Sequence, residues 1–172
     1  MIRKIILITG GAKSGKSRYA EGLAAQLGER RVYVATAEPK DAEMVERIAL
    51  HRGWRDEAWT TVEEPLRLTA ALLDLNGRAD VVLVDCLTLW VSNLLLEKNE
   101  RSANDRVDDL ISALDQIAFH LIFVTNEVGW GIVPENPLAR KFRDVAGSTN
   151  QRVAEAADQV FAMVSGIAVK LK

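Results

Sequence analysis

The sequence contains few of the features that mark disulfide-bonded, repeat or nucleic-acid-binding proteins. Its 172 residues include one cysteine, Cys86, which excludes an internal disulfide and is compatible with a reducing cytoplasm. Cys86 lies in an apolar run, which favours a buried thiol over a reactive one. The 22 basic and 24 acidic side chains nearly balance, and no internal repeat or block of like charge occurs. We therefore expect no nucleic-acid partner.

A long hydrophobic run is also missing near the start of the chain. Arg3 and Lys4 precede an apolar run that covers only residues 5–9. This run is too short for a signal peptide and for a bilayer-spanning helix, which needs about 20 residues. We therefore expect a cytoplasmic protein without a membrane span. A chain of this length fits a single domain, residues 1–172, with a sizeable core.

A glycine-rich segment, TGGAKSGKS at residues 9–17, overlaps the end of this apolar run. Gly10, Gly15, Lys16 and Ser17 match the pattern G-x-x-x-x-G-K-[ST] of a phosphate-binding loop. Glycines let successive backbone N–H groups point at one anion, the lysine reaches the β- and γ-phosphates, and the hydroxyl can hold Mg²⁺. The positive end of the helix expected next faces the same phosphates. An ordinary glycine turn is the alternative, and the strand–loop–helix context disfavours it.

Apolar runs with strand character alternate with helical patterns along the whole chain. We expect strands at residues 5–9, 32–35, 59–62, 80–86, 119–125, 159–165 and 167–171, and helices at 16–27, 41–51, 66–75, 88–97, 105–118 and 138–157. Pro65 suits the first turn of the helix at 66–75, and residues 98–104 read as a polar loop. The pattern predicts an α/β fold: a mostly parallel central sheet with an antiparallel edge strand and helices on both faces.

Two strand ends supply further candidates for a nucleotide site. The run DVVLVDC places Asp85 at the end of a buried strand, where phosphate-loop proteins carry a magnesium-binding carboxylate. A simple cap of the next element is the alternative role for Asp85. Ala35, Thr36 and Ala37 close the strand at 32–35, and ligands of open α/β sheets sit outside such carboxyl ends. Ser17 and Asp85 are therefore the expected Mg²⁺ ligands.

The chain has two histidines, His51 and His120. His120 begins an apolar strand, which favours packing or hydrogen bonding at the strand end. His51 lies beside Arg52 and Arg55, and a neutral imidazole can attack a phosphorus centre while guanidinium groups stabilise the developing charge. A histidine at a helix end can equally do no more than interact with the helix dipole. Residue chemistry alone favours this second role and leaves the first open.

The phosphate loop and Asp85 together predict an enzyme that binds a nucleoside triphosphate and Mg²⁺. A short chain favours a small-molecule kinase or a nucleotidyltransferase. A GTPase switch would carry N-K-x-D, which TNEV at residues 125–128 does not match, and a motor or transporter ATPase would bring extra domains. A nucleotide-sensing module without turnover is an alternative from a different class.

Four further segments are distinctive: EMVERIALH at residues 43–51, VTNEVGWGIVPE at 124–135, NPLAR at 136–140 and VSGIAVKLK at 164–172. Together with TGGAKSGKS and with VAT at 34–36, they resemble the bifunctional adenosylcobinamide kinase / adenosylcobinamide-phosphate guanylyltransferase family of cobalamin biosynthesis. The resemblance runs nearly end to end. The NEVG-containing run and the tail are more specific than the phosphate loop, which many unrelated enzymes share.

The resemblance implies two reactions. Such enzymes phosphorylate the aminopropanol hydroxyl of adenosylcobinamide with ATP or GTP, then transfer GMP from GTP onto that phosphate and release pyrophosphate. It also implies a RecA-like P-loop NTPase fold, Mg²⁺ without a tightly bound organic cofactor, and a homotrimer with sites between subunits. Trp54, Trp59 and Trp130 are candidate corrinoid contacts, or core and interface residues. A monofunctional guanylyltransferase and a small-molecule kinase unrelated to corrinoids are the enzyme alternatives.

GMP transfer in the family passes through a guanylylated histidine, and the matching residue here is His51. Carried over position by position, the resemblance implies His51 and Lys16 as catalytic residues. The implied nucleotide-binding residues are Gly10, Gly11, Ala12, Lys13, Ser14, Gly15, Lys16, Ser17, Ala35, Thr36, Ala37, Arg52, Gly53, Trp54, Arg55, Glu63 and Asp85.

Three positions depart from the family pattern. Lys13 stands where the family usually has arginine, which exchanges a bidentate fork for a point charge. Asp85 stands where some relatives have glutamate, and the shorter carboxylate can shift the metal or bind it through water. Leu50 stands where relatives can carry a second histidine, so His51 is the only candidate nucleophile of its segment.

Overall fold

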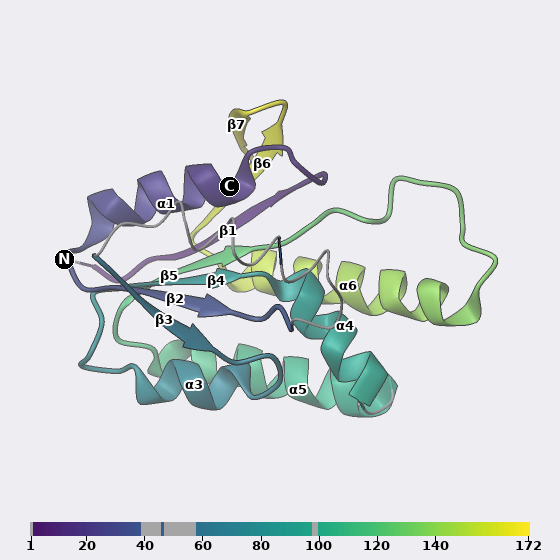
Figure 1. The fold of residues 1–172 in the computed structure, drawn as a ribbon, viewed down its shortest axis with the longest axis horizontal. Coiled ribbons are helices and arrows are strands. Elements are labelled where there is room, and N and C mark those ends of the chain that lie inside the picture. The colour runs from purple at the N-terminus through teal and green to yellow at the C-terminus, as the bar shows by residue number, and fades with distance from the viewer. Residues whose placement is uncertain (1, 39–45, 47–57, 98–99) are drawn as a thin grey trace.

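The structure, a computed structural model, describes residues 2–38, 46, 58–97 and 100–172. Its elements in chain order are β1 (Ile5–Gly10), α1 (Lys16–Leu27), β2 (Arg31–Ala35), β3 (Trp59–Glu63), α3 (Leu68–Asp74), β4 (Val81–Asp85), α4 (Leu87–Glu97), α5 (Glu100–Ala113), η1 (Leu114–Gln116), β5 (His120–Val124), α6 (Pro137–Ala156), β6 (Gln159–Val164) and β7 (Ile167–Lys170). Figure 1 shows the strands as one layer between helices. The helix expected at residues 41–51 lies outside the described residues, apart from Glu46.

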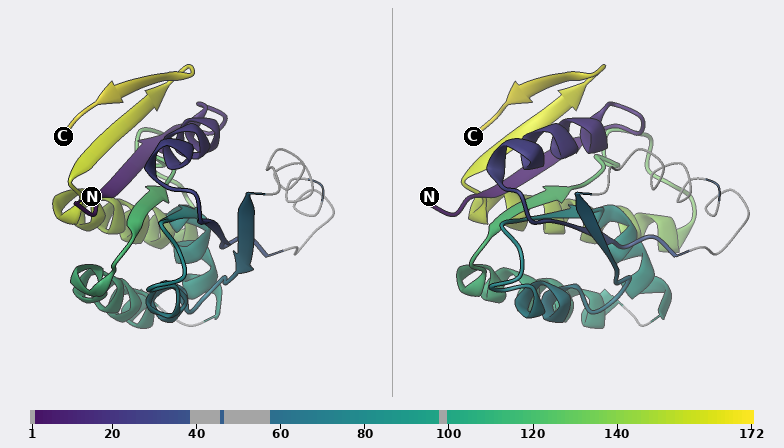
Figure 2. Two further views of the ribbon diagram at one scale, coloured as in Figure 1. Left: turned by 90° about the vertical axis from the view of Figure 1, so that its left-hand side faces the viewer. Right: turned by 60° about the vertical axis from the view of Figure 1, so that its left-hand side comes forward.

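The strands form a seven-stranded sheet in the order β3-β2-β4-β5-β1-β6-β7. All neighbouring pairs from β3 to β6 are parallel, and only β7 runs antiparallel, against β6. In Figure 2, β3 forms one edge and the β6–β7 hairpin the other. The expected α/β fold, with an antiparallel edge strand and helices on both faces, is confirmed.

The two faces of the sheet build two separate parts of the core. Side chains alternate along a strand, so Ile5 and Leu7 of β1 face α3, α4, α5 and α6, whereas Ile6 and Ile8 face α1. Four consecutive aliphatic residues in β4 are fully buried, as a parallel strand covered on both faces requires. The phosphate-loop strand β1 is an interior strand as well, with β5 paired on one side and β6 on the other.

The loop expected at residues 98–104 is wrong, because α5 begins at Glu100 and residues 100–104 are helical. Ala103, Val107 and Leu110 follow one another at helical spacing and are buried against the sheet-side core. A single buried alanine among polar neighbours is enough to continue the apolar face. The helix expected at 105–118 ends earlier, at Ala113, and continues as the 3₁₀ turn η1.

The start of α3 also differs from expectation, because the helix begins at Leu68 and Pro65 lies in a turn before it. Glu64 Oε1 accepts hydrogen bonds from the backbone N–H groups of Leu66 and Arg67, at 3.0 and 2.7 Å. This local bonding favours a turn over a first helical turn. The expectation for Pro65 is therefore wrong.

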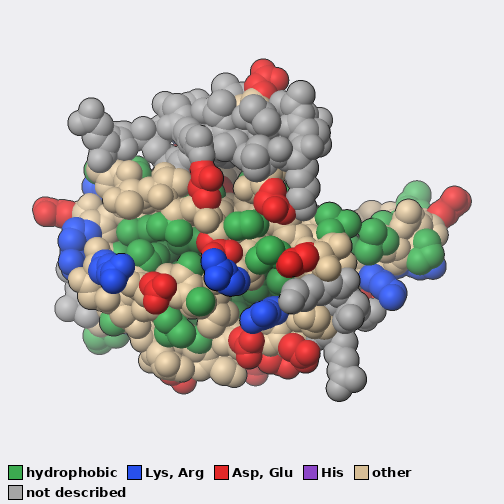
Figure 3. All heavy atoms as spheres, turned by 60° about the horizontal axis from the view of Figure 1, so that its bottom comes forward, with side chains coloured by type: hydrophobic (Ala, Val, Ile, Leu, Met, Phe, Trp, Pro, Cys, Tyr) green, Lys and Arg blue, Asp and Glu red, His purple; other side chains and the backbone are tan. Residues whose placement is uncertain are grey.

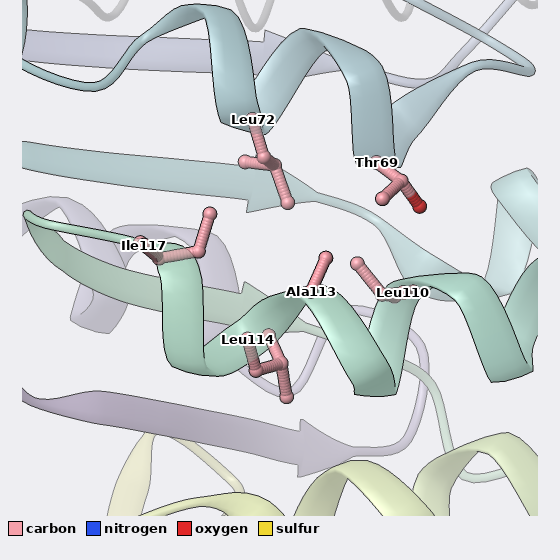
Figure 4. Close-up of a pocket in the computed structure, with 6 residues that line it drawn as sticks. All are labelled: Thr69, Leu72, Leu110, Ala113, Leu114 and Ile117. Atoms are coloured by element: carbon pink, nitrogen blue, oxygen red, sulfur yellow. The ribbon is translucent and has the colours of Figure 1, made fainter.

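The contact between α3 and α5 is closely packed. A depression between them is lined by Thr69, Leu72, Leu110, Ala113, Leu114 and Ile117 (Figure 4). It leaves no room for a water molecule, so it is a packing feature and not a ligand site.

Two sequence expectations about single residues are confirmed. Cys86 is buried, and burial raises the pKa of its thiol to about 12, so it is an unreactive core residue. His120 is buried at the start of β5, and its Nδ1 accepts a hydrogen bond from the Lys4 backbone N–H at 3.2 Å. Burial lowers the pKa of His120, which keeps this acceptor nitrogen unprotonated.

Candidate active site

The loop between β1 and α1 has the backbone shape that the glycine pattern predicts. Gly10 and Gly15 have φ angles of 145° and 96°, and Lys13 also lies in the left-handed region at 56°. A Cβ on Gly10 would come within 2.5 Å of the Met163 backbone oxygen, and a Cβ on Gly15 within 3.3 Å of Gly166 Cα. Both glycines are therefore required by the close approach of β6 and the hairpin after it.

The β6–β7 hairpin supports this loop directly. The Gly166 backbone N–H donates to the Ser14 backbone oxygen at 3.0 Å. Ser14 Oγ is buried and has no hydrogen-bond partner within the described chain. The specific VSGI tail of the sequence thus forms a structural wall of the phosphate loop.

Lys16 is held inside the loop. Its side chain belongs to a residue only 7% exposed, and Nζ donates to the Gly11 backbone oxygen at 2.6 Å. Burial lowers the pKa of Lys16, and the neighbouring Cys86 and Asp85 partly offset this effect. A buried lysine ammonium whose burial is only partly offset by its neighbours is strongly attracted to an incoming anion.

Ser17 and Asp85 meet at the end of β4. Ser17 Oγ donates to Asp85 Oδ2 at 2.7 Å, and the Tyr33 hydroxyl donates to the same oxygen at 3.1 Å. A hydroxyl and a carboxylate beside a phosphate loop are the hard oxygen ligands that Mg²⁺ prefers, so the pair fits this ion. No cluster of three or more His, Cys, Asp or Glu side chains with metal-binding geometry occurs among the described residues.

The carboxyl ends of neighbouring strands bring further expected residues into one row. Glu63 is paired with Ala35, Ala35 with Asp85, and Asp85 with Val124 in the sheet register. Glu63 and Asp85 thus lie two strands apart at the same edge of the sheet. This is the edge at which β1 runs into the phosphate loop.

Thr36 has a different local role from its neighbours. Its Oγ1 donates to the Cys86 backbone oxygen at 2.7 Å and accepts from the Cys86 N–H at 2.8 Å. Asn93 Nδ2 donates to the Thr36 backbone oxygen at 2.8 Å. The Thr36 hydroxyl therefore joins the ends of β2 and β4, and it is buried beneath the edge where Ala35 and Ala37 are partly exposed.

His51, Arg52, Gly53, Trp54 and Arg55 lie outside the described residues. Their expected roles in the nucleotide site stay predictions.

A second group of residues at this edge was not assigned by sequence reasoning. Glu127 and Gly129 follow β5, and together with residues of α6 they line a cleft of about 460 Å³. The α6 residues are Arg143, Asp144, Gly147, Ser148, Asn150 and Gln151. Glu127 could have been found by the rule that singled out Asp85, because both acidic residues follow buried parallel strands. Residues 142–144, 147 and 150–152 of α6 share in the family resemblance, but no pattern in the sequence places them beside Glu127.

The structural neighbours share the fold. The flagellar accessory protein FlaH of Methanocaldococcus jannaschii superimposes with a TM-score of 0.58 at 18% identity, covering 98% of this chain and 78% of FlaH. The RadB recombinase superimposes with a TM-score of 0.56 at 17% identity, covering 92% of this chain and 73% of RadB. Together with the loop at residues 10–17, this likeness defines a P-loop NTPase of RecA-like fold, as expected from the sequence.

Sequence comparison is more specific. The family model described as cobinamide kinase / cobinamide phosphate guanyltransferase matches residues 6–171, and the chain belongs to this family. The bifunctional adenosylcobalamin biosynthesis protein CobU of Escherichia coli (strain K12) is 43% identical over 182 residues, covering 98% of this chain and 99% of CobU. The bifunctional adenosylcobalamin biosynthesis protein CobP of Pseudomonas aeruginosa is 44% identical over 166 residues, covering 96% of each chain. The resemblance noted in the sequence is confirmed.

No helix in the described ranges combines the length and the apolar character needed to cross a bilayer.

Proposed function

We propose that this protein phosphorylates adenosylcobinamide with ATP or GTP and then transfers GMP from GTP onto the new phosphate. The observation that carries the proposal is the family match over residues 6–171, which includes a phosphate loop with intact geometry. The products are adenosylcobinamide-GDP and pyrophosphate.

The loop at residues 10–17 is the proposed triphosphate site of both reactions. The buried charge of Lys16 and the N-terminus of α1 support this role, because both favour an anion inside the loop. Lys13 adds a second cation to the same loop. These charges would hold the departing diphosphate or pyrophosphate as negative charge develops on it.

Ser17 and Asp85 are the proposed Mg²⁺ ligands, supported by the 2.7 Å contact between their side chains. The ion would neutralise charge on the phosphate oxygens of the triphosphate. The Tyr33 hydroxyl donates a second hydrogen bond to Asp85 Oδ2. This bond keeps the carboxylate oriented toward Ser17.

His51 is the proposed nucleophile of guanylyl transfer. Its imidazole nitrogen would attack the α-phosphorus of GTP, the bond to the β-phosphate would break, and pyrophosphate would leave. An oxygen of cobinamide phosphate would then attack the same phosphorus and break the nitrogen–phosphorus bond. Arg52, Gly53, Trp54 and Arg55 would bind the nucleotide beside it.

The guanine nucleotide is proposed to lie along the edge formed by residues 35–37 and Glu63. The register that aligns Glu63, Ala35 and Asp85 supports this placement, because it puts them on one line leading to the phosphate loop. A carboxylate such as Glu63 can accept hydrogen bonds from guanine N1–H and the exocyclic amine, or from ribose hydroxyls.

We also propose that the protein is a homotrimer in the cytoplasm. Residues 125–136 and the start of α6 expose several large apolar side chains, of which Trp130 and Ile132 are 92% and 97% exposed. Figure 3 shows hydrophobic side chains on the projection at the right, where Figure 1 draws this loop. A neighbouring subunit would cover them. The nucleoside triphosphates that the enzyme would use are cytoplasmic metabolites.

The oligomer can be tested by sedimentation equilibrium. The wild type should have the mass of a trimer, and a Trp130→Ser, Ile132→Ser double variant should dissociate. A monomeric wild type would contradict this part of the proposal.

The activity is tested by incubating the purified protein with adenosylcobinamide, Mg²⁺ and either ATP or GTP, and analysing the corrinoids by mass spectrometry. We expect adenosylcobinamide phosphate first and adenosylcobinamide-GDP when GTP is present. Conversion of ready-made adenosylcobinamide phosphate alone would indicate a monofunctional guanylyltransferase. Triphosphate turnover without corrinoid dependence would indicate an unrelated kinase, and GTP binding without turnover a sensing module.

A further inference from the structure

The cleft between the loop after β5 and helix α6 opens at the edge of the sheet that carries the phosphate loop. It has a volume of about 460 Å³. Its position is fixed by two backbone hydrogen bonds: Thr125 N–H donates to the Ile8 oxygen at 3.0 Å, and Glu127 N–H donates to the Gly10 oxygen at 3.1 Å. Gly10 is the first residue of the phosphate loop, so the segment that forms one wall of the cleft is hydrogen-bonded directly to that loop.

A buried polar network holds Asn150, which lines the cleft. Thr125 Oγ1 donates to Asn150 Oδ1 at 2.7 Å and lies 3.2 Å from Thr88 Oγ1. Asn150 Nδ2 donates to the Asn126 backbone oxygen at 3.2 Å, and the Asn126 N–H donates to Thr88 Oγ1 at 2.6 Å. Satisfied buried networks fix one conformation. This one ties the start of the loop to α4 and α6.

The far end of the loop is tied down as well. Arg140 Nη1 donates to the backbone oxygens of Pro134 and Glu135, at 2.9 and 2.6 Å. The Asn136 side chain caps the N-terminus of α6. Hydrogen bonds therefore hold both ends of the loop against α6, and the two walls of the cleft are pre-organised.

Within the cleft, the carboxylate of Glu127 is held in place. Its Oε1 accepts a hydrogen bond from the Gly129 N–H at 2.7 Å. A Cβ on residue 129 would lie 2.9 Å from the same oxygen, so glycine at this position permits the contact. The second carboxylate oxygen accepts no hydrogen bond from the described part of the chain, and its lone pairs can accept one from a ligand.

The opposite wall supplies polar groups, one cation and the carboxylate of Asp144, which is paired with that cation. Ser148 and Gln151 of α6 line the cleft with hydroxyl and amide groups, which suit a ligand rich in amides. Arg143 also lines it, and the side chain is 23% exposed with Nη2 3.5 Å from Asp144 Oδ1. This combination suits a neutral alcohol bearing amide groups and, later, its phosphate ester.

We propose that this cleft binds the aminopropanol arm of the corrinoid acceptor and that Glu127 takes the proton from the acceptor hydroxyl in the kinase step. The inference rests on the proposed function and adds a site and a catalytic base to it. The hydroxyl oxygen attacks the γ-phosphorus, its proton passes to the Glu127 carboxylate, and the bond from the γ-phosphorus to the bridging oxygen breaks. The nucleoside diphosphate leaves with that oxygen.

The same cleft then serves the second step without a base. The acceptor is now a phosphate ester whose oxygen carries negative charge and has no proton to lose. Arg143 pairs with this phosphate, because a guanidinium binds phosphate oxygens through charge-assisted hydrogen bonds. Glu127 is therefore needed for the first reaction only, and Arg143 mainly for binding the acceptor of the second.

The experiment measures both half-reactions separately in Glu127→Gln, which keeps the shape of the side chain and an acceptor for Gly129 N–H. We expect kcat for phosphorylation of adenosylcobinamide to fall about 100-fold or more. Guanylyl transfer onto ready-made adenosylcobinamide phosphate should stay within about twofold, which also shows that the variant is folded. Glu155→Gln, the same change on an exposed part of α6, is the matched control and should change neither rate.

Two further variants test the geometry. Gly129→Ala should displace the Glu127 carboxylate and slow the kinase step alone. Arg143→Met should raise KM for adenosylcobinamide phosphate about tenfold or more, and should raise it by a larger factor than KM for adenosylcobinamide.

The rates of the two half-reactions distinguish a failure of the Glu127 assignment from a failure of the proposed kinase and guanylyltransferase function. A wild type that makes both products, with Glu127→Gln still phosphorylating adenosylcobinamide at the wild-type rate, would overturn the assignment of Glu127 and leave the proposed function standing. Equal loss of both half-reactions in Glu127→Gln would also overturn it. A wild type that makes neither product would overturn the proposed function itself.

Discussion

Ser17 Oγ donates a 2.7 Å hydrogen bond to Asp85 Oδ2, which joins the first turn of α1 to the carboxyl end of β4. The two residues are far apart in the sequence, and the parallel pairing of β4 with β2 and β5 brings Asp85 to this position. A hydroxyl and a carboxylate are thereby fixed next to the phosphate loop, as a metal-assisted phosphoryl or nucleotidyl transfer requires.

Asp85→Asn should weaken the use of Mg²⁺ without disrupting the fold. An amide keeps the size of the side chain and can still bond to Ser17, but it carries no charge for the metal. We expect the Mg²⁺ concentration for half-maximal GTP turnover to rise about tenfold or more. Asp74→Asn, at an exposed carboxylate on α3, is the control, and an unchanged Mg²⁺ dependence in Asp85→Asn would contradict the metal assignment.

Lys16→Met should abolish nucleotide binding without lowering the stability of the free protein. Burial lowers the pKa of Lys16, so holding the lysine protonated weakens the folded state at neutral pH, and this effect fades as the pH rises toward 10.5. Methionine fills similar space without that charge. The melting temperature of the variant should equal or exceed that of the wild type, with the difference shrinking toward high pH.

Differential scanning fluorimetry with and without GTP measures both parts of this prediction. At a GTP concentration about 100 times Kd, the wild type should gain roughly 5–10 °C. Lys16→Met should gain nothing, whereas protection equal to that of the wild type would show that the triphosphate does not use this lysine.

Gly10→Ala should destabilise the protein through its backbone. A Cβ there would lie 2.5 Å from the Met163 oxygen, on a residue with φ of 145°. We expect a loss of about 2–3 kcal/mol in the free energy of unfolding by urea. The control is Gly22→Ala, in the exposed middle of α1 with open space around it, which should gain about 0.5–1 kcal/mol. Equal effects of the two changes would contradict the close packing of β1 on β6.

The Arg30–Asp80 pair predicts a defined acid dependence of stability. Arg30 donates to both carboxylate oxygens of Asp80 and holds the pKa of this carboxyl at about 2. A lowered folded pKa gives stability that is complete above about pH 4 and is lost as the pH falls toward 2. Asp80→Asn should therefore be less stable than the wild type at pH 7, and the difference should narrow between pH 4 and 2.

Urea unfolding across this pH range provides the measurement. Asp74→Asn, at an exposed carboxylate on α3, serves as the control and should show no such narrowing. A difference between Asp80→Asn and the wild type that persists unchanged at pH 2 would contradict the role of the pair.

The sheet could be predicted from the sequence because buried parallel strands leave local signals. Runs such as VVLV before Asp85 are apolar on both faces, and the loop at residues 10–17 has a fixed spacing with a chemical reason for each residue. The start of α5 was missed because its apolar face begins with Ala103, a small residue among polar ones. An alanine alone does not predict a buried helix face. Ala103 is recognised as part of that face only by its helical spacing to Val107 and Leu110.

The cleft beside Glu127 could not be predicted in the same way. Asn150 meets Thr125 and Asn126 only because α6 packs back against the end of β5. Hydrogen bonds between segments so far apart depend on tertiary packing, and one sequence carries no periodic signal for them. The sequence alone shows that Glu127 follows an apolar strand, but it does not show which residues of α6 lie opposite it.

In the proposed mechanism the phosphate loop binds the triphosphate of GTP, and His51 forms a covalent bond to the GMP group. The most direct test is incubation with GTP labelled with ³²P at the α-phosphate, followed by acid and base treatment of the denatured protein. The wild type should carry a label that is lost in acid and kept in base, as a phosphoramidate is, and both His51→Ala and Lys16→Met should carry none. An equal label on His51→Ala would contradict this mechanism.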